Sequence, residues 1–200
     1  MNNLTAEAWD KRYQDKNSPW DLGCPAPPFR NLLVSASAPK PGRIAVLGCG
    51  QGHDALLFAE SGYQVVGFDF APSAIAVATS AAENRELEAQ FLQRDILALN
   101  AEFANSFDYV LEHTCFCAID PSLRSRYVDV VKSILRPDSQ LIGLFYTHNR
   151  PGGPPFGVKP QEVLGYFADF EPMVFQLAQD SSDRRRGDEH LAIFQHKSFS

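Results

Sequence analysis

The sequence predicts an α/β protein built on a doubly wound, mostly parallel sheet. From Arg43 onward, short apolar runs typical of buried strands alternate with segments of helical character. Glycine or aspartate stands at the end of each of the first three runs. Parallel strands joined by helices carry their binding sites at the carboxyl ends of the strands, which is where these residues would lie.

Seven strands and the helices between them follow from local signals. Gly62 ends one helix, and Pro72 and Pro121 open two others, because proline suits a first helical turn. The expected strands are 44–47, 64–68, 90–93, 109–111, 140–146, 173–177 and 190–195. The expected core helices are 54–61, 72–83, 121–135 and 161–167. The last two strands would form an antiparallel hairpin, which completes a seven-stranded Rossmann-like sheet.

The first forty residues are expected to form a cap over the core. They hold two short helical segments, 5–14 and 29–37, with a proline-rich stretch between them. Pro39, Pro41 and Gly42 then break the chain. We therefore expect a single domain, 1–200, with residues 1–40 as an N-terminal helical cap and residues 41–200 as the Rossmann-like core.

Composition narrows the class of protein. The chain has 200 residues, 44% of them hydrophobic, so it can bury a full core and is not expected to be disordered. Eighteen basic residues against 24 acidic ones give a net charge of -6, which argues against nucleic acid as a partner. The apolar stretches are too short for a membrane span, and the N-terminus does not resemble a signal peptide. Four cysteines make no disulfide framework, so we expect a cytoplasmic protein with free thiols.

A glycine loop follows the first expected strand, with glycines at Gly48, Gly50 and Gly52. A dinucleotide site would need its third glycine at position 53, which is His53, so nicotinamide-dependent oxidoreduction is disfavoured. The spacing instead resembles motif I of class I S-adenosylmethionine-dependent methyltransferases. In those enzymes the glycines let the backbone approach the amino-acid half of the cofactor. A simple tight turn is the alternative interpretation.

Acidic residues at the next two strand ends support the same cofactor. Asp69 comes 19 residues after Gly50, where a carboxylate can accept both ribose hydroxyls of an adenosine. The resemblance implies that Asp95 lies near the adenine amine and Ile96 against its ring, and Phe70 is assigned to the same site. A lone aspartate at a strand end can also be a helix cap, but three such features in order and spacing favour the cofactor site.

Three further segments resemble the thiopurine S-methyltransferase family, which includes plant and bacterial thiol and halide methyltransferases. In that family two aromatic residues eleven positions apart close over the cofactor and the methyl-transfer site, and Trp9 and Trp20 have this spacing. The segments 112–121 and 145–156, with their Phe-Cys-Ala-Ile and Gly-Gly-Pro-Pro-Phe motifs, match the family's fourth-strand segment and fifth-strand loop. The likeness extends from residue 7 to about residue 170.

The sequence departs from that family at His113. There the halide-type enzymes carry tyrosine and the thiopurine enzymes arginine. A thiol is far more reactive as its thiolate, and a histidine could take its proton or stabilise the anion, which favours a thiol acceptor. His113 could instead bind the cofactor, to which Glu112 is also assigned. The resemblance places Tyr146 at the substrate, with a core aromatic as the alternative.

Two other groups have plainer interpretations. Cys115 and Cys117 share one face of a strand with no second ligand pair near them, so core packing is favoured over a metal site, and no metal is expected. Arg186 could clamp an anionic substrate, although a solvated run of charge is the commoner explanation.

The sequence therefore predicts a methyltransferase that moves a methyl group from S-adenosyl-L-methionine, by in-line displacement, onto a small soft nucleophile, with S-adenosyl-L-homocysteine as product. A thiol is the favoured acceptor. Halide, metalloid, oxygen or nitrogen acceptors, or a non-catalytic adenosine-binding module, are the alternatives. The expected partners are a small-molecule acceptor without nucleic acid or membrane, and the expected state is a monomer or weak homo-oligomer.

Overall fold

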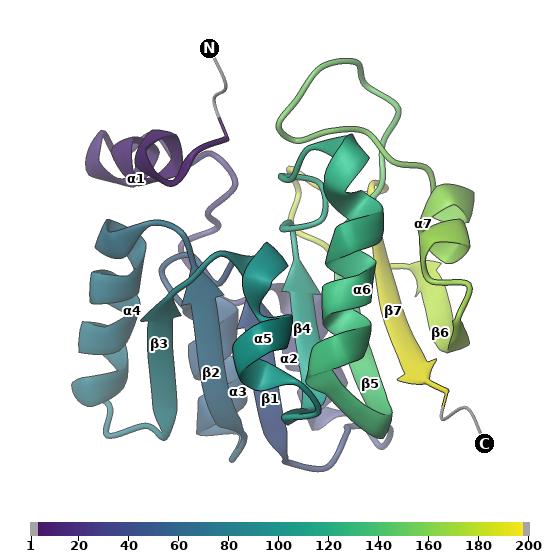
Figure 1. Cartoon of the computed structure of the whole chain (residues 1–200), viewed down its shortest axis with the longest axis horizontal. Coiled ribbons are helices and arrows are strands. Elements are labelled where there is room, and N and C mark those ends of the chain that lie inside the picture. Colours follow the sequence, from purple (N-terminus) through teal and green to yellow (C-terminus); the bar gives the residue numbers. More distant parts are fainter. Residues whose placement is uncertain (1–3, 198–200) are drawn as a thin grey trace. The chain divides into compact units, whose positions relative to one another are not determined.

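The computed structural model describes residues 4–197, and its contacts divide the chain into two units, Met1–Ile96 and Leu97–Ser200. Each unit has its own strands and helices (Figure 1). Within residues 4–197, no helix is long and apolar enough to cross a membrane.

The first unit contains three parallel strands in the order β3-β2-β1. They are β1 (Arg43–Leu47), β2 (Gln64–Asp69) and β3 (Ala89–Gln93). The helices are α1 (Ala6–Gln14), α2 (Pro27–Val34), α3 (His53–Glu60) and α4 (Pro72–Glu83). Because the strands are parallel, β1 and β2 end at the same edge, with Leu47 beside Phe68, and the glycine loop and Asp69 are thereby brought together.

An aromatic core joins the cap to this unit. Phe29 of α2 packs edge-on against Phe58 of α3 at 5.9 Å between ring centroids, and Phe58 packs against Tyr63 at 5.0 Å. All three are at most 1% exposed. The Tyr63 hydroxyl donates to the Pro39 carbonyl at 2.6 Å, so the tyrosine is buried with its polar end satisfied.

The second unit contains four strands in the order β4-β5-β7-β6. They are β4 (Phe107–His113), β5 (Leu135–Tyr146), β6 (Phe170–Leu177) and β7 (Glu189–His196); β4 and β5 are parallel, and β7 runs antiparallel to both β5 and β6. The helices are the short α5 (Asn100–Phe103), α6 (Arg124–Ile134) and α7 (Pro160–Tyr166), with 3-10 turns at Ile96–Ala98 and Pro121–Leu123. The core gathers buried rings from four segments, namely Phe116, Phe145, Phe167 and Phe194.

The predicted fold class is confirmed, including the antiparallel C-terminal strands, while the single-domain description stays a prediction. Two strands begin three or more residues earlier than expected. The β5 strand starts at Leu135, across an irregularity in the register with β4, because Phe107 pairs with Leu135 before Tyr109 pairs with Gln140. The β6 strand begins at Phe170 and includes Pro172, which is tolerated because β6 pairs only with β7. The four-residue α5 has no sequence signal that we recognised.

Gly52 combines a left-handed backbone with close packing against a neighbouring helix. Its φ is +84°, and a Cβ added there would lie 2.9 Å from the Ala78 Cβ. Gly23 is a matched control, because its φ is +67° but nothing lies within 4 Å of an added Cβ. We expect Gly23→Ala to lower the free energy of unfolding by about 1–2 kcal/mol through backbone strain, and Gly52→Ala by about 1 kcal/mol more through the clash. Urea unfolding would measure both; equal losses would contradict the packing role of Gly52.

Candidate functional site

The glycine loop turns at the end of β1 through left-handed backbone conformations. Gly48, Gly50 and Gly52 have φ values of 61°, 53° and 84°, which glycine adopts without steric cost. The Gly50 amide donates to Oδ2 of Asp69 at 2.8 Å, and the Ala71 amide donates to Oδ1 at 2.9 Å. The loop is therefore closed against the end of β2 by a carboxylate.

Asp69 is 8% exposed, so its carboxylate is held away from most of the solvent. Burial raises the pKa of Asp69 above its ordinary value, although the amides of Ala71, Gly50 and Phe70 oppose the shift. Each oxygen accepts one of the backbone bonds described above and keeps further acceptor capacity. This acidic group at the strand end can therefore accept further hydrogen bonds.

An aromatic cluster made of Trp9, Tyr13 and Trp20 lies in the cap. Trp9 and Trp20 pack edge-on at 5.2 Å, and Tyr13 packs against Trp20 at 5.6 Å. The Trp20 Nε1 donates to the Tyr13 hydroxyl at 3.3 Å. That hydroxyl lies 2.9 Å from where a Cβ on Gly50 would be, so the cluster lies directly over the glycine loop. The sequence predicted that Trp9 and Trp20 cover the cofactor, and the structure brings the two rings into contact with each other.

Tyr13 was not among the predicted site residues. It follows Trp9 by four positions, so both lie on one face of α1, and this helical spacing is the signal that could have found it. Burial and the nearby Asp69 carboxylate raise the pKa of the Tyr13 hydroxyl, which stays protonated.

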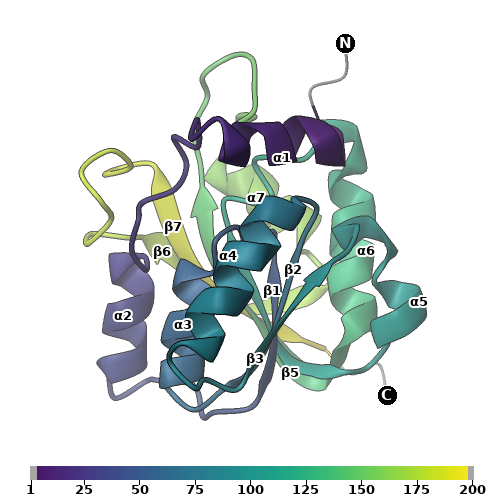
Figure 2. The same cartoon turned by 90° about the vertical axis from the view of Figure 1, so that its left-hand side faces the viewer.

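Three carboxylates attach the cap to the rest of the first unit. Asp10 accepts the Ser73 amide at the start of α4 at 2.8 Å, and Figure 2 shows α1 lying across that end of α4. Asp54 accepts the Ala26 amide at 2.7 Å. Asp21, just after Trp20, lies 3.2 Å from Nε2 of His53. The cap is therefore held mainly at helix N-termini, where acidic groups are favoured.

The residues predicted for the adenine lie at the ends of β2 and β3. Ile96 is buried at 7% exposure, whereas Asp95 is exposed. Phe70 is half-buried, and its carbonyl accepts the Gln93 side chain at 3.1 Å. The apolar side chain of Ile96 and the polar side chain of Asp95 are thus neighbours in the chain after β3. A purine ring and its amine would require one group of each kind.

The first unit offers what a phosphate-free adenosine sulfonium ligand needs. A turn in which every second residue is glycine adjoins a buried carboxylate and a cluster of aromatic rings. Sulfonium cations are attracted to aromatic faces in the way that other cations are. The residues present therefore fit S-adenosylmethionine, and the hydroxyl of Tyr13 fills the space beside Gly50 in this conformation.

Glu112, in the second unit, is turned inward. It is 0% exposed, and its Oε1 accepts the amides of Cys115 and Phe116 at 3.1 and 3.0 Å. The Tyr127 hydroxyl donates to Oε2 at 2.7 Å. Burial raises the pKa of Glu112, and these bonds oppose the shift. The side chain predicted to bind the cofactor thus organises the turn after β4.

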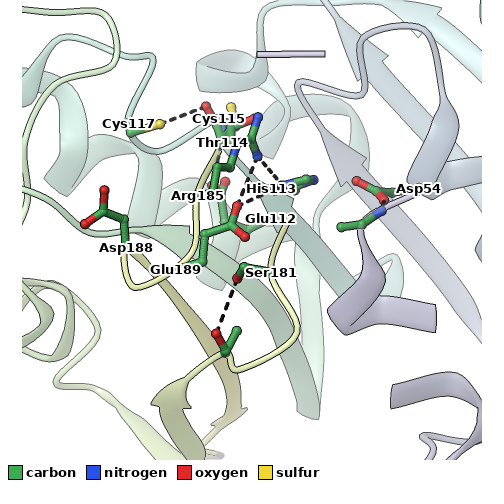
Figure 3. A network of polar contacts seen from close by, with 12 residues as sticks. Asp54, Glu112, His113, Thr114, Cys115, Cys117, Ser181, Arg185, Asp188 and Glu189 are labelled. Atoms are coloured by element: carbon green, nitrogen blue, oxygen red, sulfur yellow. Dashed lines mark hydrogen bonds and ion pairs between the residues drawn. The ribbon is translucent and has the colours of Figure 1, made fainter. Parts of the chain in front are cut away.

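His113 ends β4 beside a buried ion pair that the sequence analysis missed (Figure 3). Nη1 of Arg185 lies 2.6 Å from His113 Nε2 and donates to Glu189 Oε1 at 3.1 Å. Arg185 is 6% and Glu189 1% exposed. Arg186, the arginine considered from the sequence, is instead exposed and pairs with Asp183. The sequence does not indicate which of the three consecutive arginines, Arg184 to Arg186, is buried.

Tyr146 lies among cationic and titratable groups. The Arg150 guanidinium donates to its hydroxyl at 2.5 Å and pairs with Asp188 at 2.9 Å. The Arg185 guanidinium lies 5.8 Å from the centre of its ring, and the His148 ring is 4.9 Å away. Tyr146 is half-buried, so it is a partly exposed, polar-flanked ring rather than a core aromatic.

The two segments that carry the family motifs meet in the second unit. The Phe156 amide donates to the Cys117 carbonyl at 2.6 Å. Arg124, 4% exposed, donates to the carbonyls of Phe156 and Gly157, each at 3.1 Å. Its guanidinium also lies 5.0 Å from the centre of the Phe116 ring. A buried arginine thus holds the 151–158 loop.

Cys115 and Cys117, the two cysteines considered for a metal site, are packed as small apolar groups. Cys115 and Cys117 are 7% and 4% exposed. Burial raises the pKa of Cys117 to about 12, and it raises the pKa of Cys49 well above its ordinary value. Among residues 4–197, no three His, Cys, Asp or Glu side chains are grouped to hold a metal ion.

Comparison with known proteins connects this geometry to a family. A family model described as thiopurine S-methyltransferase matches residues 4–198. A probable thiol methyltransferase 2 of Arabidopsis thaliana is 33% identical over 166 residues, which are 81% of this chain and 72% of that protein. A thiopurine S-methyltransferase of Legionella pneumophila is 30% identical over 146 residues, 66% of each chain.

Solved structures share the fold. One of them comes from work on the conversion of a disulfide bond into a thioacetal group during echinomycin biosynthesis. Its superposition on this chain has a TM-score of 0.81 at 22% sequence identity, and the aligned part is 98% of this chain and 94% of the other. A Burkholderia thailandensis 1,6-didemethyltoxoflavin-N1-methyltransferase with bound S-adenosylhomocysteine has a TM-score of 0.77 at 17% identity, covering 96% and 87%. Through the family model and the Arabidopsis relative, the chain belongs to the thiopurine S-methyltransferase family of S-adenosylmethionine-dependent methyltransferases.

Proposed function

We propose that this protein transfers a methyl group from S-adenosylmethionine to the sulfur of a small thiol. The observation that carries the proposal is the glycine loop closed on Asp69 beneath the Trp9–Tyr13–Trp20 cluster. Relatives named for thiol, thiocyanate and thiopurine substrates support a sulfur acceptor. The low content of basic residues favours a small molecule over a polymer.

We assign the cofactor to residues of the first unit. Gly48, Gly50 and Gly52 would let the backbone approach the amino-acid half, Asp69 would accept the ribose hydroxyls, and Phe70, Asp95 and Ile96 would surround the adenine. Trp9 and Trp20 would cover the bound molecule. The inward-turned carboxylate of Glu112 supports a structural role for that residue, so we no longer propose it as a cofactor ligand.

We keep His113 and Tyr146 as the catalytic residues proposed from the sequence. When bound, S-adenosylmethionine supplies a methyl group on a sulfonium; the acceptor sulfur forms the new C–S bond while the old one breaks and leaves S-adenosylhomocysteine. The chain's own contribution is alignment and exclusion of water, and alignment can supply roughly 7 to 11 kcal/mol. The high pKa and burial of Cys117 argue against a cysteine-assisted metalloid reaction.

Purified protein should bind S-adenosylmethionine and form S-adenosylhomocysteine when it is given a small thiol such as 2-mercaptoethanol. Calorimetry would measure binding, and mass spectrometry would detect both products. Thiocyanate, iodide and tellurite serve as competing acceptors. Absence of cofactor binding would refute the methyltransferase proposal, whereas binding with turnover on another acceptor alone would refute only the thiol assignment.

The bond from the Ser73 amide to Asp10 should support cofactor binding by holding the cap in place. We expect Asp10→Ala to weaken S-adenosylmethionine binding about fivefold. This factor corresponds to the free energy of one hydrogen bond between an amide and a partly exposed carboxylate. Asp15→Ala is the matched control, because Asp15 is exposed and pairs with Lys11 of the same helix. Titration calorimetry compares the two, and equal affinities would show that the Asp10 contact does not hold the cap.

The pair of Asp21 and His53 should make stability depend on pH. The hydrogen bond to Asp21 raises the pKa of His53, so the stabilisation is complete below about pH 6.5 and is lost as pH rises through the raised pKa. Because the pair is partly exposed, we expect His53→Gln to cost a few tenths to about 1 kcal/mol at pH 6 and almost nothing at pH 9. Urea unfolding of His53→Gln, Asp21→Asn and the double variant measures this; additive losses at pH 6 would contradict the pairing.

A further inference from the structure

The contact between His113 and Arg185 constrains where the histidine carries its proton. A guanidinium has five N–H donors and no acceptor, and it stays charged in proteins. At 2.6 Å from Arg185 Nη1, the Nε2 atom of His113 must therefore offer its lone pair. A histidine that accepts at Nε2 is the neutral imidazole with its proton on Nδ1.

Glu189 completes the arrangement. The second hydrogen on Arg185 Nη1 can reach Glu189 Oε1, which lies at 3.1 Å, so one nitrogen bridges the imidazole and the carboxylate. Burial raises the pKa of Glu189, and the charge of Arg185 opposes that rise. The hydrogen bond from the Arg185 guanidinium favours the ionised carboxylate, which in turn fixes the position of the guanidinium. The pair is almost fully buried, which limits competition from water.

The charged form of His113 would need a different arrangement. An imidazolium carries a proton on Nε2, which would face the N–H of Arg185 instead of accepting it. Glu189 Oε1 is 3.5 Å from His113 Nε2 and could take that proton as an acceptor only if Arg185 moved away. Glu112, on the same strand, also interacts electrostatically with His113, but its carboxylate is already bonded to Tyr127 and to two backbone amides.

We propose that Arg185 and Glu189 are positioning residues that hold His113 as the neutral imidazole protonated on Nδ1. In the methyl transfer proposed above, on which this part of the inference rests, His113 then acts as a hydrogen-bond donor through Nδ1 rather than as the base that deprotonates the thiol. The thiol loses its proton to water, and the acceptor sulfur keeps the electron pair that forms the new C–S bond.

Nitrogen-15 NMR tests the protonation state without any assay of activity. Long-range proton–nitrogen spectra of the full-length labelled protein at pH 7.5 distinguish the two neutral tautomers from the imidazolium, and His113→Asn assigns the signal by its loss. We expect the Nδ1-protonated pattern. Either the Nε2-protonated pattern or an imidazolium in the wild-type protein would overturn the inference.

Variants of the ion pair provide a second test. Arg185→Met should abolish the Nδ1-protonated pattern, and Arg185→Lys should largely restore it, because an ammonium also donates. Arg186→Met is the matched control, since that neighbouring arginine is exposed and bound to Asp183, and it should leave the His113 signals unchanged. An unaltered His113 spectrum in Arg185→Met would refute the positioning role.

Kinetics separates the role of the tautomer from the proposed function. Asparagine can place an N–H near the Nδ1 position, whereas glutamine reaches the Nε2 position. We expect kcat to fall in both variants, and to fall about tenfold further in His113→Gln than in His113→Asn, which is the effect of one hydrogen bond in the transition state. Equal losses in both variants would overturn the donor role. Failure of the wild type to methylate any acceptor would refute the proposed function and leave the NMR result to decide the tautomer.

Discussion

The contact between the Gly50 amide and the Asp69 carboxylate is the constraint on which the first unit depends. A buried carboxylate is costly unless it is hydrogen-bonded, and Asp69 obtains its donors from the glycine loop and from the turn that leads into α4. The loop in turn can present an amide there only because left-handed residues follow β1. Strand, loop and helix are thus positioned by one side chain, and the same side chain remains able to receive hydroxyl groups.

The cap uses the same physical principle at its edges. Asp10 and Asp54 accept backbone amides, the first at the start of α4 and the second in the segment that leads into α2. Aromatic packing then adds an apolar cover, in which Tyr13 and Trp20 share a hydrogen bond. Because none of the residues of α1 is buried, this helix is held by a small number of directional bonds. Such an element can open for a ligand at modest cost in free energy.

The second unit compensates each buried charge in a different way. Glu112 is satisfied by two amides and a tyrosine hydroxyl, Arg124 by two carbonyls, and Arg185 by Glu189 together with His113. Only the last of these arrangements includes a group that titrates near neutrality. His113 is therefore the titratable group that this ion pair can influence, and the other two networks serve the turn after β4 and the 151–158 loop.

The sequence by itself determined the fold class, the positions of the seven strands to within about five residues, the glycine loop followed by Asp69, and the spacing of Trp9 and Trp20. These features follow from local periodicity, turn chemistry and spacing along the chain, which act over short distances. Only the tertiary structure decided that Tyr13 lies over Gly50, that Glu112 turns inward, and that Arg185 rather than Arg186 is buried against His113. Neighbouring arginines have the same local propensities. Which of them is buried depends on the path of the loop before β7 and on a glutamate at the start of that strand, and both are set by contacts between segments far apart in the sequence.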